Sequence, residues 1–437
     1  MIKKEYIDAV SPYNFWGASV ETGISRDSYV ERVHKSLSIP KVVVSVTGIR
    51  RAGKTYICRQ AMKRAIDGGM KKEQTLYVNL EEPALEPFLS VAFLNDIYDT
   101  YRHLYNPADD ALVVLDEVQN VPGWERWARA MMEKNERARL IITGSSSKVM
   151  HSDLATVLTG RYVEVRVTPF SFREFVQHSE TGGKLPHGGI RHLYHEYLEY
   201  GGFPASIMTP DKAAKQIYLS ELFDAIVTKD IAAKYGMRRL HEFRSAVVLM
   251  LQSVSAYISV PRLRNSLAGF GLKASPRTLN LYLGLLSDSL LFHYVPIFSY
   301  KAKDQMQYPR KLYCADTGLV NAVSRHSPPG YGALAENAVA MELLRRYGKD
   351  SFFYWKDPDG REVDFVLVFD GKPRELYQVC WNMKDEKTRE RETRSLEIAK
   401  KELNVRKATI LTEEPVDCGK LAEVVRLEDW MAGKEAV

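Results

Sequence analysis

The sequence predicts an α/β protein that begins with a parallel sheet covered by helices on both faces and continues into a helical region and a smaller α/β unit. Two observations predict this fold class. Apolar, largely β-branched runs at residues 41–47, 75–80, 112–115 and 140–142 alternate with helical stretches, which is typical of a parallel sheet with crossover helices. The first run leads directly into a glycine loop and a helix at 56–66. The 437 residues leave room for roughly two to four domains.

The glycine loop, GIRRAGKT at residues 48–55, satisfies G-x-x-x-x-G-K-[ST], the pattern of a P-loop NTPase. We expect Gly48 and Gly53 to adopt backbone angles that a side chain would forbid, so that N–H groups surround a triphosphate. Lys54 is expected to reach the β- and γ-phosphates of ATP, and Thr55 to offer its hydroxyl to Mg²⁺. A glycine turn with a chance lysine is the competing interpretation, which the flanking strand and helix disfavour. The residues expected to line the nucleotide are Gly48, Arg50, Arg51, Ala52, Gly53, Lys54, Thr55 and Tyr56.

An acidic pair, Asp116 and Glu117, follows the buried run at 112–115 and has the form of a Walker B motif. The carboxyl end of this strand is expected beside the glycine loop, where Asp116 would support the Mg²⁺ shell. Glu117 is then placed to orient or deprotonate the water that attacks the γ-phosphate. A solvated acidic turn would be the better interpretation of this pair if the glycine loop were absent.

Hydroxyl residues at 143 and 145–147 follow the buried run at 140–142. A serine or threonine at this strand end can hydrogen-bond the γ-phosphate or the attacking water; we choose Ser145, with Thr143 in reserve. A hydroxyl-rich cap of the following helix is the alternative, and the sequence leaves both open. Near the amino terminus, Arg26 and Tyr29 either touch adenine or pack in the core, and their helical spacing favours the core.

Together these motifs resemble the AAA-type P-loop ATPases of archaea and bacteria that carry a C-terminal restriction-endonuclease-like domain of unknown function. The resemblance implies an ATPase whose cofactors are ATP and Mg²⁺. In AAA-type ATPases an arginine finger precedes the last core strand, and Arg161 occupies that place; a surface arginine at a helix end is the alternative. An arginine finger would require a homo-oligomer. The resemblance rests on TGIRRAGKT (47–55), LDEVQNVPGWE (115–125), ITGSSS (142–147), TGR (159–161), PFSFREF (169–175) and YGGFP (200–204).

The resemblance and the sequence pattern divide the chain into four parts. We expect an ATPase core at 1–175, a helical lid at 176–238, a winged helix at 239–326 and a restriction-endonuclease-like domain at 327–437. The winged helix is expected from helices at 241–255, 260–270 and 276–290 followed by strands at 292–300 and 311–314. Its basic residues would contact DNA phosphates or merely solubilise the surface. They are Arg262, Arg264, Lys273, Arg277, Lys301, Lys303, Arg310 and Lys311.

The last part has the element order of the PD-(D/E)xK nuclease fold, in which two carboxylates and a lysine hold Mg²⁺ and activate water. Asp364 takes the place of the first carboxylate, Gln378 that of the second, and Glu336 is the acid on the preceding helix. The lysine belongs two residues after Gln378, where this chain has Cys380. Lys384 could substitute only by reaching in from another element. A degenerate domain used for binding or assembly is therefore favoured over cleavage.

Composition is that of an ordinary globular protein, with 45% hydrophobic and 27% charged residues. The four cysteines have no metal-ligand or disulfide spacing, and a net charge of +6 is too mild to indicate nucleic-acid binding. No signal peptide or membrane span is expected, so we predict a cytoplasmic protein.

We predict a Mg²⁺-dependent ATPase that couples its nucleotide state to movement of the winged-helix and nuclease-like modules. Its partners would be DNA, bound through the winged helix, or a protein client. The alternatives are a nucleotide-gated scaffold with slow hydrolysis and a DNA nuclease licensed by ATP.

Overall fold

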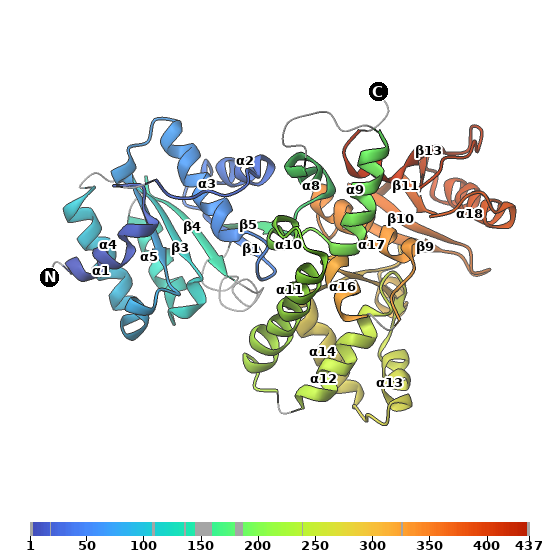
Figure 1. The fold of residues 1–437 in the computed structure, drawn as a ribbon, viewed down its shortest axis with the longest axis horizontal. Coiled ribbons are helices and arrows are strands. Elements are labelled where there is room, and N and C mark those ends of the chain that lie inside the picture. Colours follow the sequence, from blue (N-terminus) through green and yellow to red (C-terminus); the bar gives the residue numbers. More distant parts are fainter. Residues whose placement is uncertain are drawn as a thin grey trace. The chain divides into compact units, whose positions relative to one another are not determined.

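The chain divides into two compact units, residues 1–168 and 169–437. A five-stranded parallel sheet forms the centre of the first unit (Figure 1). The strand order in this computed structural model is β2-β3-β4-β1-β5. Every neighbouring pair is parallel, so all five strands end at one edge, which we call the carboxyl edge. The strands are β1 Val43–Gly48, β2 Thr75–Asn79, β3 Leu112–Asp116, β4 Arg139–Gly144 and β5 Tyr162–Val167. The predicted α/β class and parallel sheet are confirmed.

The structure describes residues 3–17, 19–106, 110–134, 137–144, 160–179, 187–237, 239–324 and 327–434. In that part of the chain, no helix combines the length and the apolar character needed to cross a membrane. All four cysteines are free, as their spacing predicts.

Helices cover both faces of the parallel sheet because successive side chains of a strand point to opposite faces. Residues of α1, α4 and α5 share one core with every second residue of β2, β3 and β4. Helices α2 and α3 pack on the other face, against β1, as Figure 1 shows. The helices of this unit are α1 Lys4–Val10, α2 Asp27–Leu37, α3 Lys54–Asp67, α4 Val91–Leu104 and α5 Trp124–Lys134, with 3₁₀ helices η1 Ser11–Tyr13, η2 Lys72–Gln74, η3 Pro83–Phe88 and η4 Val118–Asn120.

The second unit begins with helices and a small antiparallel sheet of order β6-β8-β7. Ser275 accepts the backbone N–H of Thr278 and Pro276 begins α14, as the Ser-Pro pair predicts. Helix α11 continues into a π-helix that the sequence did not predict. The elements are α8 Phe172–Ser179, α9 His187–Tyr200, α10 Pro204–Met208, α11 Lys212–Ala225, π-helix η5 Ile226–Ala233, α12 Leu240–Leu251, β6 Tyr257–Ile258, α13 Val260–Gly269, α14 Pro276–Asp288, β7 Phe292–Val295, α15 Ala302–Gln307, β8 Arg310–Cys314 and α16 Thr317–Val323.

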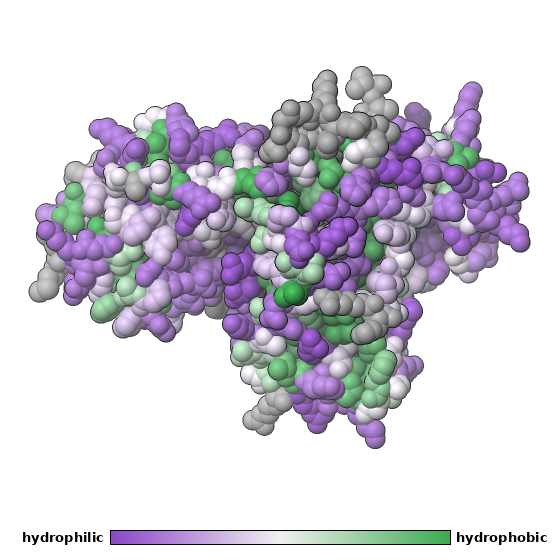
Figure 2. Space-filling view, in the orientation of Figure 1, coloured by the Kyte–Doolittle hydropathy of each residue, from purple (hydrophilic) through white to green (hydrophobic). Residues whose placement is uncertain are grey.

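A mixed sheet of order β13-β12-β11-β10-β9 completes the second unit. Strands β9, β10 and β11 pair antiparallel, whereas β12 joins β11 and β13 in parallel. Most residues of helix α18 are charged or polar, and Figure 2 shows hydrophilic (purple) side chains over this helix. The elements are α17 Tyr331–Tyr347, β9 Phe352–Lys356, β10 Glu362–Phe369, β11 Lys372–Val379, α18 Glu386–Leu403, β12 Lys407–Thr412, β13 Glu423–Arg426 and α19 Leu427–Met431.

Candidate functional site

The loop between β1 and α3 lies at the carboxyl edge and has the geometry of a phosphate cradle. Gly53 has φ of 96° and immediately precedes α3, a backbone conformation that glycine adopts without strain. Gly48 is needed for another reason than the expected one: a Cβ there would lie 2.3 Å from the carbonyl oxygen of Val167 on β5. Arg51 also adopts a left-handed conformation, with φ of 67°. The open N–H groups at the start of α3 favour an anion.

The two functional side chains of the loop lie at the start of α3. Lys54 is only 6% exposed, and its Nζ lies 3.1 Å from the carbonyl oxygen of Gly48 and 3.9 Å from Oε1 of Glu117. Thr55 donates its hydroxyl to Oδ2 of Asp116 at 2.8 Å. The structure therefore brings together the lysine, the hydroxyl and both acids that the sequence assigns to the nucleotide site.

Asp116 is buried at the end of β3, where three hydroxyl groups donate to its carboxylate. Besides Thr55, they are those of Tyr77 on β2 and Thr143 on β4. Burial first, and then the charge of Asp116, raises the pKa of Tyr77 well above its ordinary value, so the phenol remains a donor. The sequence analysis missed Tyr77, which is one of several apolar-looking residues on a buried strand.

Glu117 lies in a turn that holds its backbone tightly. Its φ and ψ are 59° and 51°, a left-handed conformation that costs a non-glycine residue roughly 1–2 kcal/mol. Its N–H donates to Oγ1 of Thr143 at 2.9 Å, so the Thr143 hydroxyl bridges both acids. Thr143, the reserve choice, thus lies at the acidic pair, whereas Ser145 falls outside the residues that the structure describes.

The donor set fits Mg²⁺ bound together with a nucleotide. The hydroxyl of Thr55 and the carboxylate of Asp116 are oxygen ligands, which Mg²⁺ prefers. Across the described ranges, no group of three His, Cys, Asp or Glu side chains could hold a metal ion by itself. Magnesium sites in nucleotide-binding proteins use one or two protein ligands and complete the shell with phosphate oxygens and water. Thr55 and Asp116 are the residues that would contribute to such a shell.

Arg26 and Tyr29 are buried beneath the glycine loop, as their helical spacing favours. Arg26 is 2% exposed and donates from one guanidinium nitrogen to the carbonyl oxygens of Ala52 and Thr168, both at 3.0 Å. The hydroxyl of Tyr29 lies 2.9 Å from that of Thr168. These two residues therefore tie the loop to the last residue of the first unit.

Arg161 lies far from the glycine loop of its own chain. It immediately precedes β5, whose Tyr162 pairs with Val43 at the start of β1. The opposite ends of the same two strands bring Val167 to Gly48, so β5 separates Arg161 from the loop by about 20 Å. Arg161 is half-exposed and forms an ion pair of 2.9 Å with Glu133.

A second cluster of charged side chains surrounds Lys311 in the other unit. Lys311 lies on β8, is 2% exposed, and its Nζ lies 2.9 Å from Oε1 of Glu336, 2.5 Å from Oε1 of Glu362 and 2.8 Å from Oδ1 of Asp364. Burial opposes its charge, but the charges of Asp364 and Glu336 outweigh this and raise the pKa of Lys311 well above its ordinary value. Lys311 is therefore not available to DNA, which corrects the sequence interpretation.

The other nuclease-like positions lie beside this cluster. Gln378 accepts the backbone N–H of Asp364 at 3.3 Å and donates to Glu392 of α18 at 2.7 Å. Lys384 is exposed and pairs with Glu414 instead of entering the cluster. A pocket of about 790 Å³ opens here. Its charged lining residues are Glu336, Asp359, Arg361, Glu362, Asp364, Lys387, Glu390, Arg391, Glu392 and Arg394.

Three carboxylates share this one lysine, and their surroundings affect their pKa values differently. Burial first, and the charge of Asp364 second, raises the pKa of Glu336 to about 8. Lys311, working against burial, lowers the pKa of Glu362. Glu336 also accepts the hydroxyl of Tyr313 at 2.7 Å.

Comparison with known proteins places these sites in a family. The chain matches a family model described as an AAA domain over residues 40–176, and models of two domains of unknown function, DUF8612 over 191–330 and DUF4143 over 331–429. An uncharacterised protein of Methanocaldococcus jannaschii is 30% identical over 374 residues, which cover 84% of this chain and 80% of that protein. The chain belongs to a family of AAA-domain ATPases with two carboxyl-terminal domains of unknown function.

The chain also resembles a second curated protein and several solved structures. An uncharacterised protein of Haemophilus influenzae is 29% identical over 352 residues, covering 78% of this chain and 83% of that protein. Among solved structures, a Walker-type ATPase of Pyrococcus abyssi is 14% identical with a TM-score of 0.46, and the match covers 69% of this chain and 95% of that chain. The Aeropyrum pernix Orc1 protein, solved in complex with DNA, is 15% identical with a TM-score of 0.31, covering 72% and 96%.

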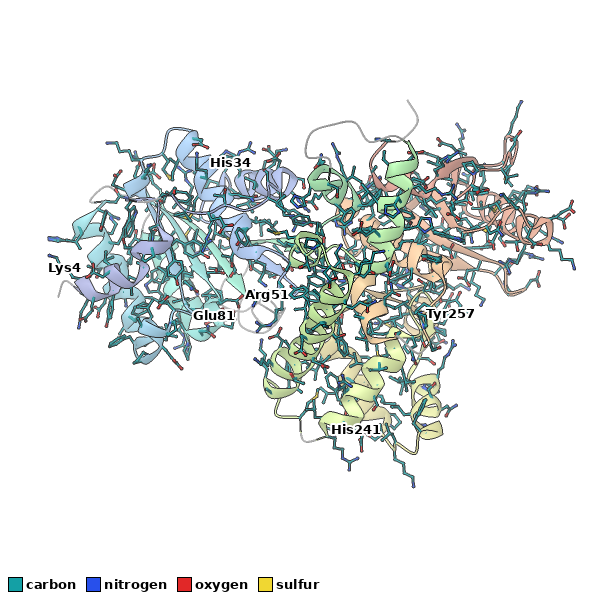
Figure 3. All side chains as sticks on the ribbon, viewed as in Figure 1. Lys4, His34, Arg51, Glu81, His241 and Tyr257 are labelled. Atoms are coloured by element: carbon teal, nitrogen blue, oxygen red, sulfur yellow. The ribbon has the colours of Figure 1, made fainter. Side chains whose placement is uncertain are left out.

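Two features of this AAA-domain protein escaped sequence reasoning. The first is Glu81, which lies near the acidic pair and is labelled in Figure 3. Burial, and secondly the charge of Glu117, raises the pKa of Glu81. Lys311 belongs to the segment matched by DUF8612, whereas its carboxylate partners belong to the segment matched by DUF4143. A basic residue within the buried run that ends at Cys314 was the signal that could have identified Lys311.

Proposed function

We propose that this chain binds ATP with Mg²⁺ at the carboxyl edge and hydrolyses it. The observation that carries the proposal is the convergence of Lys54 and Thr55 with the acids Asp116 and Glu117. Lys54 neutralises charge on the β- and γ-phosphates. Its weak interaction with Glu117 is lost when it turns to the phosphates. Glu117 accepts a proton from water as the water oxygen bonds to the γ-phosphorus and ADP leaves with the bridging oxygen. Bound Mg²⁺ supplies further charge neutralisation.

Glu117→Gln tests the assignment of the base. The amide keeps the size of the side chain but cannot accept the proton, so we expect ATP to remain bound while phosphate release falls by about 100-fold or more. Filter binding of γ-labelled ATP and phosphate release measure the two quantities on the same sample. Wild-type turnover in Glu117→Gln would remove Glu117 from the mechanism, and a wild type that binds ATP but releases almost no phosphate would favour the nucleotide-gated scaffold.

Coupling of the nucleotide state to the second unit is the finer part of the proposal. It is supported by Arg26, whose guanidinium donates both to Ala52 in the phosphate loop and to Thr168 at the unit boundary. A shift of the loop on nucleotide binding changes one of these two hydrogen bonds, and the other transmits the change to the chain that enters the second unit. The winged-helix and nuclease-like modules are the parts that we propose to move.

The trans-acting role of Arg161 requires that copies of the chain assemble. Its place at the amino edge of the sheet, away from the glycine loop of its own chain, is compatible with action on the γ-phosphate of another copy but not on that of its own site. A finger of this kind contributes on the order of 10³-fold to the rate. Mixing inactive Lys54→Ala with inactive Arg161→Ala should therefore restore partial activity through hybrid interfaces. A monomeric wild type with full activity would contradict the role.

DNA binding, if the client is DNA, is expected to be electrostatic and centred on the winged helix, whose basic residues other than Lys311 are exposed. Arg277 and Lys303 lie on α14 and α15. Each lost phosphate contact reduces the slope of log affinity against log salt by about 0.9, so the double alanine variant should flatten it by about 1.8. Gel-shift titrations at several salt concentrations measure the slope, with the exposed Lys372→Ala as control. Absence of binding at low salt would favour a protein client.

For the pocket beside the Lys311 cluster we propose binding or assembly in place of phosphodiester cleavage. Cys380 occupies the position of the missing lysine, and the carboxylates that would hold a metal are engaged by Lys311. This arrangement fits a bound metal poorly. Cleavage of supercoiled plasmid that disappears in Asp364→Ala would instead support the ATP-licensed nuclease.

A further inference from the structure

The amide of Gln119 contacts the proposed catalytic base. Gln119 lies in η4, two residues after Glu117, and its Nε2 donates to Oε2 of Glu117 at 2.6 Å. Because a carboxylate only accepts hydrogen bonds, the NH₂ group must face Glu117. The carbonyl oxygen Oε1 therefore points to the other side of the amide.

That carbonyl oxygen is buried and has no hydrogen-bond partner among the described residues. A buried acceptor left without a partner costs roughly 1–3 kcal/mol, so its presence calls for a donor that the described residues do not supply. ATP hydrolysis brings such a donor to this place, because the attacking water carries two O–H groups and must lie beside Glu117.

Hydrogen bonds of the neighbouring Asn120 anchor the turn that carries Gln119. Asn120 donates from its side chain to the carbonyl oxygen of Leu80 at 3.1 Å, which ties η4 to the end of β2. The backbone N–H of Asn120 also donates to the carbonyl oxygen of Glu117 at 3.2 Å. The turn that carries both Gln119 and Glu117 is thus anchored, whereas Lys54, 3.9 Å from the Glu117 carboxylate, is the group that phosphate would attract away.

We propose that Gln119 is a positioning residue for ATP hydrolysis, an inference that rests on the proposed ATPase function. Its N–H holds the carboxylate of Glu117, and its carbonyl oxygen accepts one O–H of the attacking water. The second O–H of that water faces Glu117, which takes the proton as the oxygen bonds to the γ-phosphorus and the bond to the bridging oxygen of ADP breaks. One amide thereby aligns both the base and the nucleophile.

Two substitutions separate positioning from a merely structural role. Gln119→Met keeps the length of the side chain but removes the donor and the acceptor, and Gln119→Glu keeps an acceptor but removes the donor. We expect kcat to fall by about 10- to 100-fold in both, since misplacement of a reacting group by about 1 Å has an effect of this size. The affinity for a fluorescent ATP analogue should stay within about twofold of wild type. Gln74→Met, which alters the capping residue of η2 before β2, is the matched control.

A double-mutant cycle tests whether Gln119 acts through Glu117. In the Glu117→Gln background, Gln119→Met should lower the residual single-turnover rate by a clearly smaller factor than in the wild type, because the base that it positions is already absent and only its contact with the water remains to be lost. A kcat near wild type in both single variants, a parallel loss of ATP affinity, or full additivity in the cycle would each overturn the inference. A wild type that binds ATP without releasing phosphate would overturn the ATPase function and this inference with it, whereas active variants beside an active wild type overturn only the role of Gln119.

Discussion

Lys54→Ala should reduce both ATP affinity and turnover by on the order of 100-fold or more, the range found when a charge-stabilising group is removed from a catalytic site. Lys54 is almost fully buried between Gly48 and Glu117, and no other lysine belongs to the loop. Its removal takes away the loop's only lysine charge from the β- and γ-phosphates, which lie beside two carboxylates. Isothermal titration with ATP and phosphate release measure the two losses.

The matched control for this variant is Lys63→Ala. Lys63 lies on the same helix α3 but is exposed and pairs with Asp67 one turn away, a surface pair worth at most about 1 kcal/mol. We expect wild-type affinity and turnover in Lys63→Ala. Full nucleotide affinity in Lys54→Ala would show that the glycine loop does not bind phosphate.

Lys311→Met should destabilise the second unit by about 3–5 kcal/mol, the usual effect of removing one partner from a buried ion pair. The variant leaves the buried Asp364 and the partly buried Glu362 without their cation. Urea unfolding measures the total loss, and hydrogen exchange over residues 362–379 measures it locally. The strands that carry the acids are expected to lose protection first.

Two further variants distinguish the charge of Lys311 from its packing. Adding Asp364→Asn to Lys311→Met removes one uncompensated charge and should recover part of the lost stability. Lys303→Met, at an exposed position of α15, should change the free energy of unfolding by less than about 0.5 kcal/mol. A loss below about 1 kcal/mol in Lys311→Met would show that the cluster contributes little to the fold.

The convergence of Lys54 and Thr55 with the two acids was largely predictable because these residues are encoded over short stretches of sequence. The loop at 48–55 and the acids at 116 and 117 each follow a buried strand directly, and parallel strands bring their carboxyl ends to one edge. The spacing of Arg26 and Tyr29 likewise indicated core packing. The steric requirement for glycine at position 48 could not be predicted, because it depends on the close approach of a strand more than a hundred residues later.

The remaining contacts depend on side chains that converge from distant segments. Tyr77 looked like a core residue of β2, and its hydrogen bond to Asp116 becomes visible only when the strands are paired. Lys311 looked like one of many surface cations, but its partners are contributed by residues 25 to 53 positions later. Periodicity identifies which face of an element is buried, whereas it does not identify which polar groups meet there.

The central claim, ATP hydrolysis at the carboxyl edge, is tested most directly by phosphate release from the wild-type chain. The measurement uses γ-labelled ATP with Mg²⁺, with EDTA, and with and without DNA, while bound nucleotide is quantified in the same samples. We predict release that needs Mg²⁺ and continues over many turnovers. Binding of ATP with no release beyond the bound nucleotide, or no binding at all, would contradict the claim.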